Sequence, residues 1–221
     1  MSLRRALAAA AIVLAATSFA HAARPKALEK VGFDQKLDAV VPTDVRLRDE
    51  TGREIRLADA LAGKPAILDF AYFRCPMLCP VSLWGLAASL KTLSWSAGEE
   101  FRVVTVSIDP ADTPAAATET KRKHLDHYGR AGAESGWRFL VGDEGEVRRL
   151  ADAVGFRFAR DERTGEYAHA AGVVFLTPEA RVSRYLYGVE PTPRDLRLAL
   201  VEAADGKIGG LTEQLLLLCF H

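Results

Sequence analysis

The sequence has few cysteines, no excess of charge of either sign and no internal repeat. Three cysteines among 221 residues are too few for a small protein held together by a framework of disulfides. Lys and Arg number 29, as do Asp and Glu, and the basic residues are scattered, so nothing indicates a surface for nucleic acid. Because hydrophobic residues make up 49% and charged residues 26%, the composition is that of an ordinary globular protein with enough apolar residues for one core.

The amino terminus has the pattern of an export signal. Arg4 and Arg5 precede an apolar run over residues 6–20, which is shorter than the roughly 20 residues that a membrane-spanning helix needs. Residues 20–22, Ala-His-Ala, have the small-x-small pattern of a cleavage site, so we expect a signal peptide over residues 1–22 and cleavage after Ala22. An uncleaved helical anchor is the alternative. Exported compartments favour disulfide formation, whereas the reducing cytosol does not.

The chain then alternates strand and helix patterns. The stretch 66–73 is almost continuously apolar, as expected of a strand buried on both faces, with Asp69 as the exception. Apolar residues recur at helical spacing in other stretches, and Thr113 followed by Pro114 marks the start of a helix. The elements expected are a hairpin at 45–57, strands at 66–73, 101–108 and 137–141, helices at 81–93, 114–128, 144–154 and 193–204, and a hairpin at 172–187.

This order predicts one α/β domain over residues 44–205, with a central mixed sheet flanked by helices and an N-terminal hairpin. Residues 23–43 contain two prolines and few periodic apolar positions, so we expect a linker that passes into the edge of the domain. Residues 206–221 form an apolar C-terminal segment.

Cys75 and Cys79 stand between an expected strand and an expected helix. Four residues apart, they would share one face of a helical turn with alpha carbons roughly 6 Å apart. This spacing suits a shared metal ion and also lies within disulfide range, so it leaves both open. A cysteine at the positive end of a helix has a stabilised thiolate, which is both nucleophile and metal ligand. A dithiol between strand and helix is a thioredoxin-like layout, and a disulfide that only staples the turn is the plainer interpretation.

A metal site with two thiolates needs at least one further donor. Sulfur together with an imidazole suits copper, with zinc as competitor. His124 and His127 lie on the helix expected over 114–128, among charged residues, so we expect them on a solvated face. His169 lies in an expected loop before an apolar strand, and a lone loop histidine is as compatible with no function as with metal binding.

Three motifs, in order, resemble those of the Sco/SenC family. Residues 70–80, FAYFRCPMLCP, resemble its aromatic-rich strand followed by C-P-x-x-C-P. Residues 106–110, VSIDP, followed by Asp-Thr-Pro at 112–114, resemble its S-[IV]-D-P motif with D-T-P close behind. His169 occurs where the family has its single ligand histidine. The motifs span roughly residues 43–205.

The resemblance implies a periplasmic protein of thioredoxin-like fold that binds copper through Cys75, Cys79 and His169. It would help to build the binuclear copper centre of cytochrome c oxidase, with the copper-site subunit and another copper chaperone as partners. It also implies a cycle in which a Cys75–Cys79 disulfide forms when the protein is idle and is reduced when the protein carries metal. Asp109 is a candidate acid beside the site, with a strand-terminating Asp-Pro turn as the alternative reading.

Two features depart from the family pattern. Ala168 stands where members commonly have an aspartate before the ligand histidine, so support for the imidazole of His169 must come from elsewhere. The segment 215–221 has four leucines and then Cys219-Phe220-His221. Cys219 and His221 could form a second thiol–imidazole site. Alternatively, the segment is a packed or interfacial helix whose cysteine behaves as a small hydrophobe. The abrupt end after four leucines leads us to expect that the segment is truncated and that the natural chain continues, with a membrane anchor as the candidate continuation.

The leading interpretation is a metallochaperone rather than an enzyme in the turnover sense. The alternative is a thiol:disulfide oxidoreductase, in which Cys75 or Cys79 attacks and the other resolves. That activity needs the dithiol but not His169. A peroxidase on the same fold is a third, weaker interpretation.

Overall fold

The structure is a computed structural model that describes residues 30–75 and 78–209, with Leu78 and Cys79 described in their backbone only. The expected signal peptide and the apolar segment 215–221 therefore lie outside the described residues. Within the described residues, no helix is long and apolar enough to cross a membrane.

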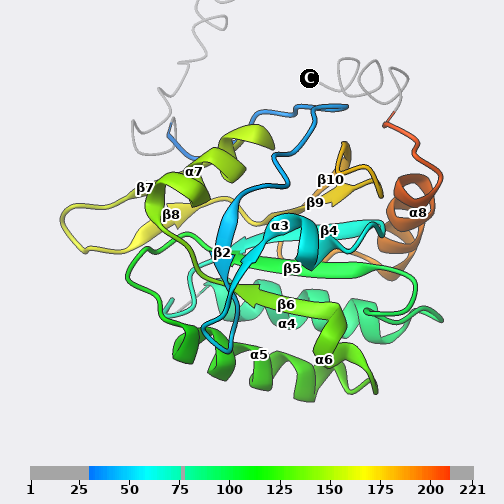
Figure 1. Ribbon diagram of the computed structural model, residues 1–221, viewed down its shortest axis with the longest axis horizontal. Helices are drawn as coiled ribbons and strands as arrows, with labels where there is room; N and C mark the ends of the chain where they lie inside the picture. The colour runs from blue at the N-terminus through cyan, green and yellow to red at the C-terminus, as the bar shows by residue number, and fades with distance from the viewer. Residues whose placement is uncertain (1–29, 76–77, 210–221) are drawn as a thin grey trace, which may run out of the picture.

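A five-stranded mixed sheet forms the centre of the fold, in the order β10-β9-β4-β5-β6 (Figure 1). The neighbours β4, β5 and β6 are parallel, whereas β9 is antiparallel to β4 and β10 is antiparallel to β9. Parallel strands end at the same edge of a sheet, so the segments that follow β4 and β5 leave the sheet side by side. The strand bounds are β4 Ala66–Ala71, β5 Arg102–Ser107, β6 Trp137–Leu140, β9 Gly172–Leu176 and β10 Val182–Tyr187.

Helices cover both faces of this sheet, because alternate residues of each buried strand point to opposite faces. In β4, Leu68 and Phe70 pack with helices α3 and α7, whereas Ile67 and Ala71 pack with α4, α5 and α8. This arrangement confirms the expected thioredoxin-like α/β fold. The helix bounds are α3 Leu57–Leu61, α4 Leu78–Lys91, α5 Pro114–Tyr128, α6 Ala133–Gly136, α7 Glu144–Ala153 and α8 Pro193–Ala204.

Local sequence signals set several boundaries. The N-terminal hairpin pairs β2 (Arg46–Arg48) with β3 (Glu54–Arg56), as the alternating pattern predicts. Helix α5 begins where the Thr-Pro pair predicts, since the Thr113 hydroxyl accepts a hydrogen bond from the amide of Ala116 at 3.2 Å. It ends at Gly129, whose φ of +65° suits a glycine.

A second, small sheet was missed by the sequence patterns. It contains β1 (Gly32–Phe33), β7 (Phe156–Arg160) and β8 (Tyr167–His169), in the order β1-β7-β8. The expectation of a loop at His169 is wrong, because this residue ends β8 and is paired with Phe158. A strand of three residues has no periodicity of its own to detect, and its hydrogen bonds come from a distant partner.

The packed domain also starts earlier than the expected boundary at residue 43. Strand β1 pairs with β7, and Val41 is buried. The amides of Asp38 and Val41 donate to the carbonyl groups of Val182 and Ala180, at 2.8 and 2.9 Å. Part of the expected linker therefore lies against the start of β10.

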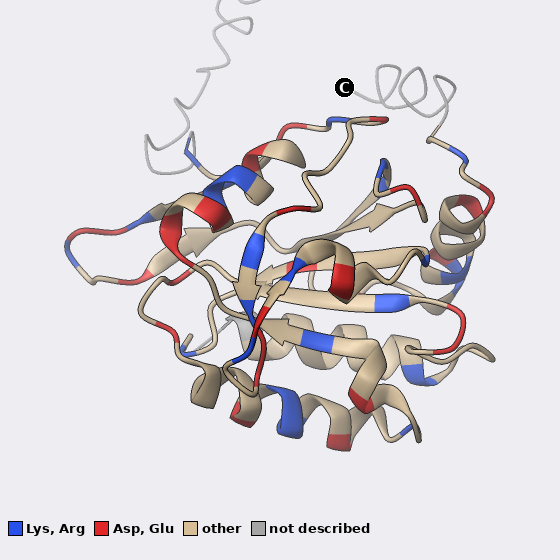
Figure 2. Ribbon diagram, in the orientation of Figure 1, with Lys and Arg blue, Asp and Glu red and all other residues tan. Residues whose placement is uncertain are grey.

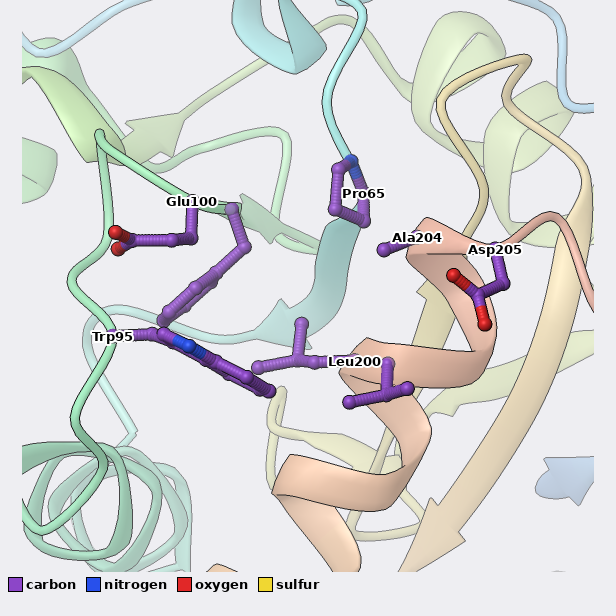
Figure 3. A pocket seen from close by; sticks show the side chains of 8 residues that line it. Pro65, Trp95, Glu100, Leu200, Ala204 and Asp205 are labelled. Carbon is purple, nitrogen blue, oxygen red and sulfur yellow. The ribbon is translucent and has the colours of Figure 1, made fainter.

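Charged residues of both signs are interspersed on the helices and loops, while the central strands are mostly uncharged (Figure 2). An open apolar hollow of about 280 Å³ lies beside Trp95 and Leu200, below Pro65 (Figure 3). Pro65 immediately precedes β4, whereas Cys75 follows it. The hollow therefore lies at the opposite end of the sheet from the cysteines.

Candidate metal and dithiol site

The first cysteine lies in a tight turn at the end of β4. The amide of Cys75 donates to the carbonyl of Tyr72 at 3.0 Å, and the partly buried Cys75 packs against the α4 side of the core. Helix α4 begins at Leu78, which places the backbone of Cys79 in its first turn. The succession of strand, dithiol and helix is confirmed. The Cys75–Cys79 disulfide stays a prediction, because the structure describes only the backbone of Cys79.

The loop after β5 holds this cysteine turn through a buried carboxylate. Asp112 is 3% exposed, and its Oδ2 accepts hydrogen bonds from the amide of Phe73 at 2.8 Å and from the hydroxyl of Ser107 at 2.6 Å. The contact follows from topology, since Ala71 and Ser107 are paired at the ends of parallel strands. Asp112 was missed as a site residue, although it belongs to the Asp-Thr-Pro motif.

Arg74 joins the same network from the position before Cys75. Its Nη2 lies 2.6 Å from Oδ2 of Asp109, and its Nε lies 2.8 Å from Oδ1 of Asp112. Both hydrogen bonds raise the pKa of Arg74, and the bond to Asp109 has the larger effect. Asp109 thus forms an ion pair with the residue next to Cys75. Its role as an acid beside a metal site stays a prediction.

Two tyrosines connect the cysteine segment to β8. The rings of Tyr72 and Tyr167 meet edge to face with their centroids 5.7 Å apart. Burial raises the pKa of both phenols, and the negative charge of Asp109 raises them further. Tyr167 lies two residues before His169 on the same strand, so their side chains share one face of β8. The fold thus brings the strand of His169 against the segment that leads to Cys75.

The imidazole of His169 is partly buried and has defined neighbours. It packs against Phe156, with centroids 6.1 Å apart, and Phe156 stacks on Phe70 of β4 at 4.5 Å. Its Nδ1 lies 3.0 Å from the carbonyl oxygen of Ala170. A carbonyl only accepts hydrogen bonds, so Nδ1 carries the proton and Nε2 is the nitrogen with a lone pair for a metal.

The hydrogen bond to the Ala170 carbonyl supports the imidazole of His169, although Ala168 stands where family members commonly have an aspartate. Ring orientation that many metal-binding histidines receive from a carboxylate can come equally from a backbone carbonyl. Burial lowers the pKa of His169, with the Ala170 carbonyl acting in the opposite direction. The imidazole is therefore neutral at neutral pH, which is the form that binds metals.

The expected solvated face at His124 and His127 is wrong for His124. This residue is 3% exposed, and its Nδ1 lies 2.7 Å from the carbonyl of Thr120. Burial lowers its pKa. His127 is half-buried and stacks on Trp84 of α4, with ring centroids 4.4 Å apart. Helix α5 packs against α4, and this contact buries a face that the charged residues made look exposed.

A further buried acid lies inside the sheet. Asp69 of β4 is 7% exposed, and burial raises its pKa to about 7, against the opposing effect of a hydrogen bond from Thr105. The hydroxyl oxygen of Thr105 in turn accepts from the indole of Trp137 at 3.0 Å. Asp69 is therefore an interior acid held by its neighbours.

The side chains that the structure describes contain no group of three His, Cys, Asp or Glu able to hold a metal ion. The expected set of Cys75, Cys79 and His169 includes a cysteine whose side chain is not described. It stays a prediction. The expected second site at Cys219 and His221 lies outside the described residues.

Comparison with known proteins gives the relationship directly. The family model SCO1/SenC matches residues 34–204. The crystal structure of an Aquifex aeolicus VF5 protein, provisionally named an electron transfer protein, is 31% identical with a TM-score of 0.66, covering 78% of this chain and 96% of that one. Arabidopsis thaliana ScoI with copper bound shares the fold, with a TM-score of 0.61 and 21% identity over 76% of this chain and 99% of that one.

A protein of Stutzerimonas stutzeri, provisionally named a copper-binding protein, is 26% identical over 132 residues. The matched region covers 58% of this chain and 60% of that protein, so the chain spans about three fifths of the length of this curated relative. The family match, in contrast, extends over nearly all of the described domain. The chain therefore belongs to the SCO1/SenC family.

Proposed function

We propose that this protein binds copper through Cys75, Cys79 and His169 and supplies it for assembly of the binuclear copper centre of cytochrome c oxidase. Support comes from the copper-bound ScoI structure and from the name of the Stutzerimonas stutzeri relative. BsSco has a similar structure, with 20% sequence identity and a TM-score of 0.58. The similarity covers 77% of this chain and 96% of the BsSco chain. BsSco is described as a member of the Sco family of cytochrome c oxidase assembly proteins that has a disulfide switch.

The observation that carries this proposal is the contact between β8 and the cysteine segment. Tyr72 lies three residues before Cys75, and its ring touches that of Tyr167, two residues before His169. A second contact, from Phe70 through Phe156 to the imidazole, supports the same placement. Residues almost a hundred positions apart in the sequence thus come to one edge of the sheet.

The donor chemistry fits copper as a cargo. Thiolates and a neutral imidazole are ligands that copper favours, and zinc is the competing metal. Three protein donors would leave a position accessible to a thiol of the receiving protein, so the metal could pass on by exchange of ligands. The burial that lowers the pKa of His169 keeps its imidazole ready to bind without first losing a proton.

The proposed cycle needs the dithiol to be reduced before metal binds and allows a Cys75–Cys79 disulfide when the protein is idle. An exported location is compatible with both states, because such compartments permit disulfides. We place the protein in the periplasm, after cleavage of the leader at Ala22, with the copper-site subunit of the oxidase and a copper donor as its partners.

The direct test measures copper binding by the reduced protein, using a competing Cu(I) chelator and native mass spectrometry. We expect one copper per chain and a weaker site in the His169→Ala variant. His127→Ala is the matched control, since His127 is also half-buried and in contact with an aromatic ring. Equal copper affinity in the His169→Ala variant and the wild type would remove the histidine from the site.

A thiol:disulfide oxidoreductase is the second candidate, favoured by the position of Cys79 in the first turn of α4, where the helix dipole stabilises a thiolate. Reduction of a target disulfide would require Cys75 and Cys79 but not His169. Oxidase copper-site assembly should therefore be compared in His169→Ala, Cys75→Ser and Cys79→Ser strains, with and without added reductant. Loss in the cysteine variants alone, rescued by reductant, would favour this activity over copper delivery.

A further inference from the structure

We propose that Arg74 is a positioning residue for the Cys75 thiol. It would act together with Asp109 and Asp112 as a clamp that fixes the cysteine turn before copper arrives. The inference builds on the proposed copper site and assigns a role to a residue that no motif of the sequence singled out. Arg74 itself would not contact the metal.

The clamp connects two segments through both backbone and side chain. Asp112 uses one carboxylate oxygen for the amide of Phe73 and the hydroxyl of Ser107, and the other for Nε of Arg74. Asp109 accepts from Nη2 of Arg74 with Oδ2 and from the amide of Ala111 with Oδ1. The two residues immediately before Cys75 are therefore both tied to the loop after β5.

The shape of arginine suits this position better than any other cation. The planar guanidinium reaches two carboxylates at once, at 2.6 and 2.8 Å. A lysine ammonium is a single point charge on a flexible stem and lacks this fork. The side chains of Asp109 and Asp112 are only 9% and 0% exposed, whereas that of Arg74 is 53% exposed and covers them from the solvent side. Removal of Arg74 would leave two neighbouring buried carboxylates without their counter-ion.

The consequence for the site follows from geometry. A thiol on a turn that is free to move must be ordered when metal binds, and that ordering lowers the affinity. Removal of a group that orients a metal ligand typically lowers the metal affinity about 10- to 100-fold. We therefore expect the Arg74→Gln variant to bind Cu(I) about tenfold more weakly than the wild type.

The matched control is Arg181→Gln. Arg181 forms an ion pair with Asp38 at 2.6 Å, but it lies next to β10 at the far end of the sheet from Cys75. Affinities are measured well below the thermal midpoint of each variant, so that loss of stability alone does not alter them. Arg74→Lys should recover less than half of the loss on a logarithmic scale. Full recovery by lysine would show that charge alone matters and would overturn the positioning role.

A readout without copper separates this inference from the proposed function. The dithiol–disulfide equilibrium constant is measured against a glutathione buffer for wild type, Arg74→Gln and Arg181→Gln. We expect at least a threefold change in Arg74→Gln and none in Arg181→Gln. A wild type that binds no copper would refute the proposed function and leave this result to decide the clamp. If Arg74→Gln matches Arg181→Gln in both measurements, Arg74 does not position the thiol.

Discussion

Replacing the buried Asp69 with asparagine should stabilise the protein, and the gain should grow as the pH rises. The carboxyl lies in β4, and burial raises its pKa to about 7 from the ordinary 3.8. Asparagine has nearly the same shape as the protonated acid, and its amide oxygen can still accept the hydrogen bond from Thr105. The variant therefore removes the ionisation while it keeps the packing.

The magnitude follows from the difference in pKa between the folded and unfolded states. Because the folded state holds the proton of Asp69 more tightly than the unfolded state does, the contribution of Asp69 to stability is highest below about pH 4, falls as the pH rises towards 7 and then levels off. Each pKa unit corresponds to about 1.4 kcal/mol, so ionised Asp69 costs the fold about 4 kcal/mol above pH 7. Between pH 5 and pH 8, the advantage of Asp69→Asn should grow by about 3 kcal/mol.

Urea unfolding of the reduced protein at pH 5, 6, 7 and 8 measures this difference. Only the divergence of the two stability curves is interpreted, because effects of the substitution that do not depend on pH cancel. Asp44→Asn is the control. Asp44 forms an ion pair with Arg149 that lowers the pKa of Asp44. The Asp44 carboxyl is therefore ionised in both the folded and the unfolded protein over this pH range. Parallel curves for Asp69→Asn and the wild type would refute the reasoning.

Three further predictions concern the strands around the site. Gly155→Ala should cost at least about 2 kcal/mol in urea unfolding, because φ is +65° and the new Cβ would lie 1.8 Å from the carbonyl oxygen of Asp34. Gly165→Ala, at φ +77° with no heavy atom nearer than 3.5 Å, should cost only about 1 kcal/mol. An equal cost would contradict the steric argument. Phe156→Ala should cost about 3–5 kcal/mol by calorimetry and should weaken copper binding, because its ring supports His169. The contribution of His169 to copper affinity, taken from His169→Gln, should stay constant from pH 8 to 6.5 and decline only in more acid solution, since burial lowers its pKa. A decline beginning above pH 6.5 would contradict a buried neutral imidazole.

The elements that could be predicted are those specified by neighbouring residues. The run at 66–73 predicts a buried strand, and Thr113 with Pro114 predicts the start of α5, because each signal depends on only a few consecutive side chains. The place of Cys75 and Cys79 between strand and helix follows in the same way. The identity of the ligands could also be proposed from sequence, since soft donors and a family motif lie at fixed positions.

Other features depend on contacts between distant segments. His124 looks solvated among charged residues, and only the packing of α5 on α4 and β6 buries it. Strand β8 is three residues long and exists because β7 offers it hydrogen bonds. The sequence motif includes Asp112 but does not reveal that its carboxylate holds Phe73 and Arg74.

By itself, the sequence determined the succession of strands and helices, the dithiol and the residue types of the proposed site. Only the tertiary structure decided that β8 lies against the cysteine segment, that the Ala170 carbonyl orients His169 and that Arg74 is held between two carboxylates. The physical reason is the range of the interactions. Backbone preferences and side-chain periodicity act over a few residues, whereas the hydrogen bonds and aromatic contacts of the site join segments that meet only when the mixed central sheet and the small sheet have formed.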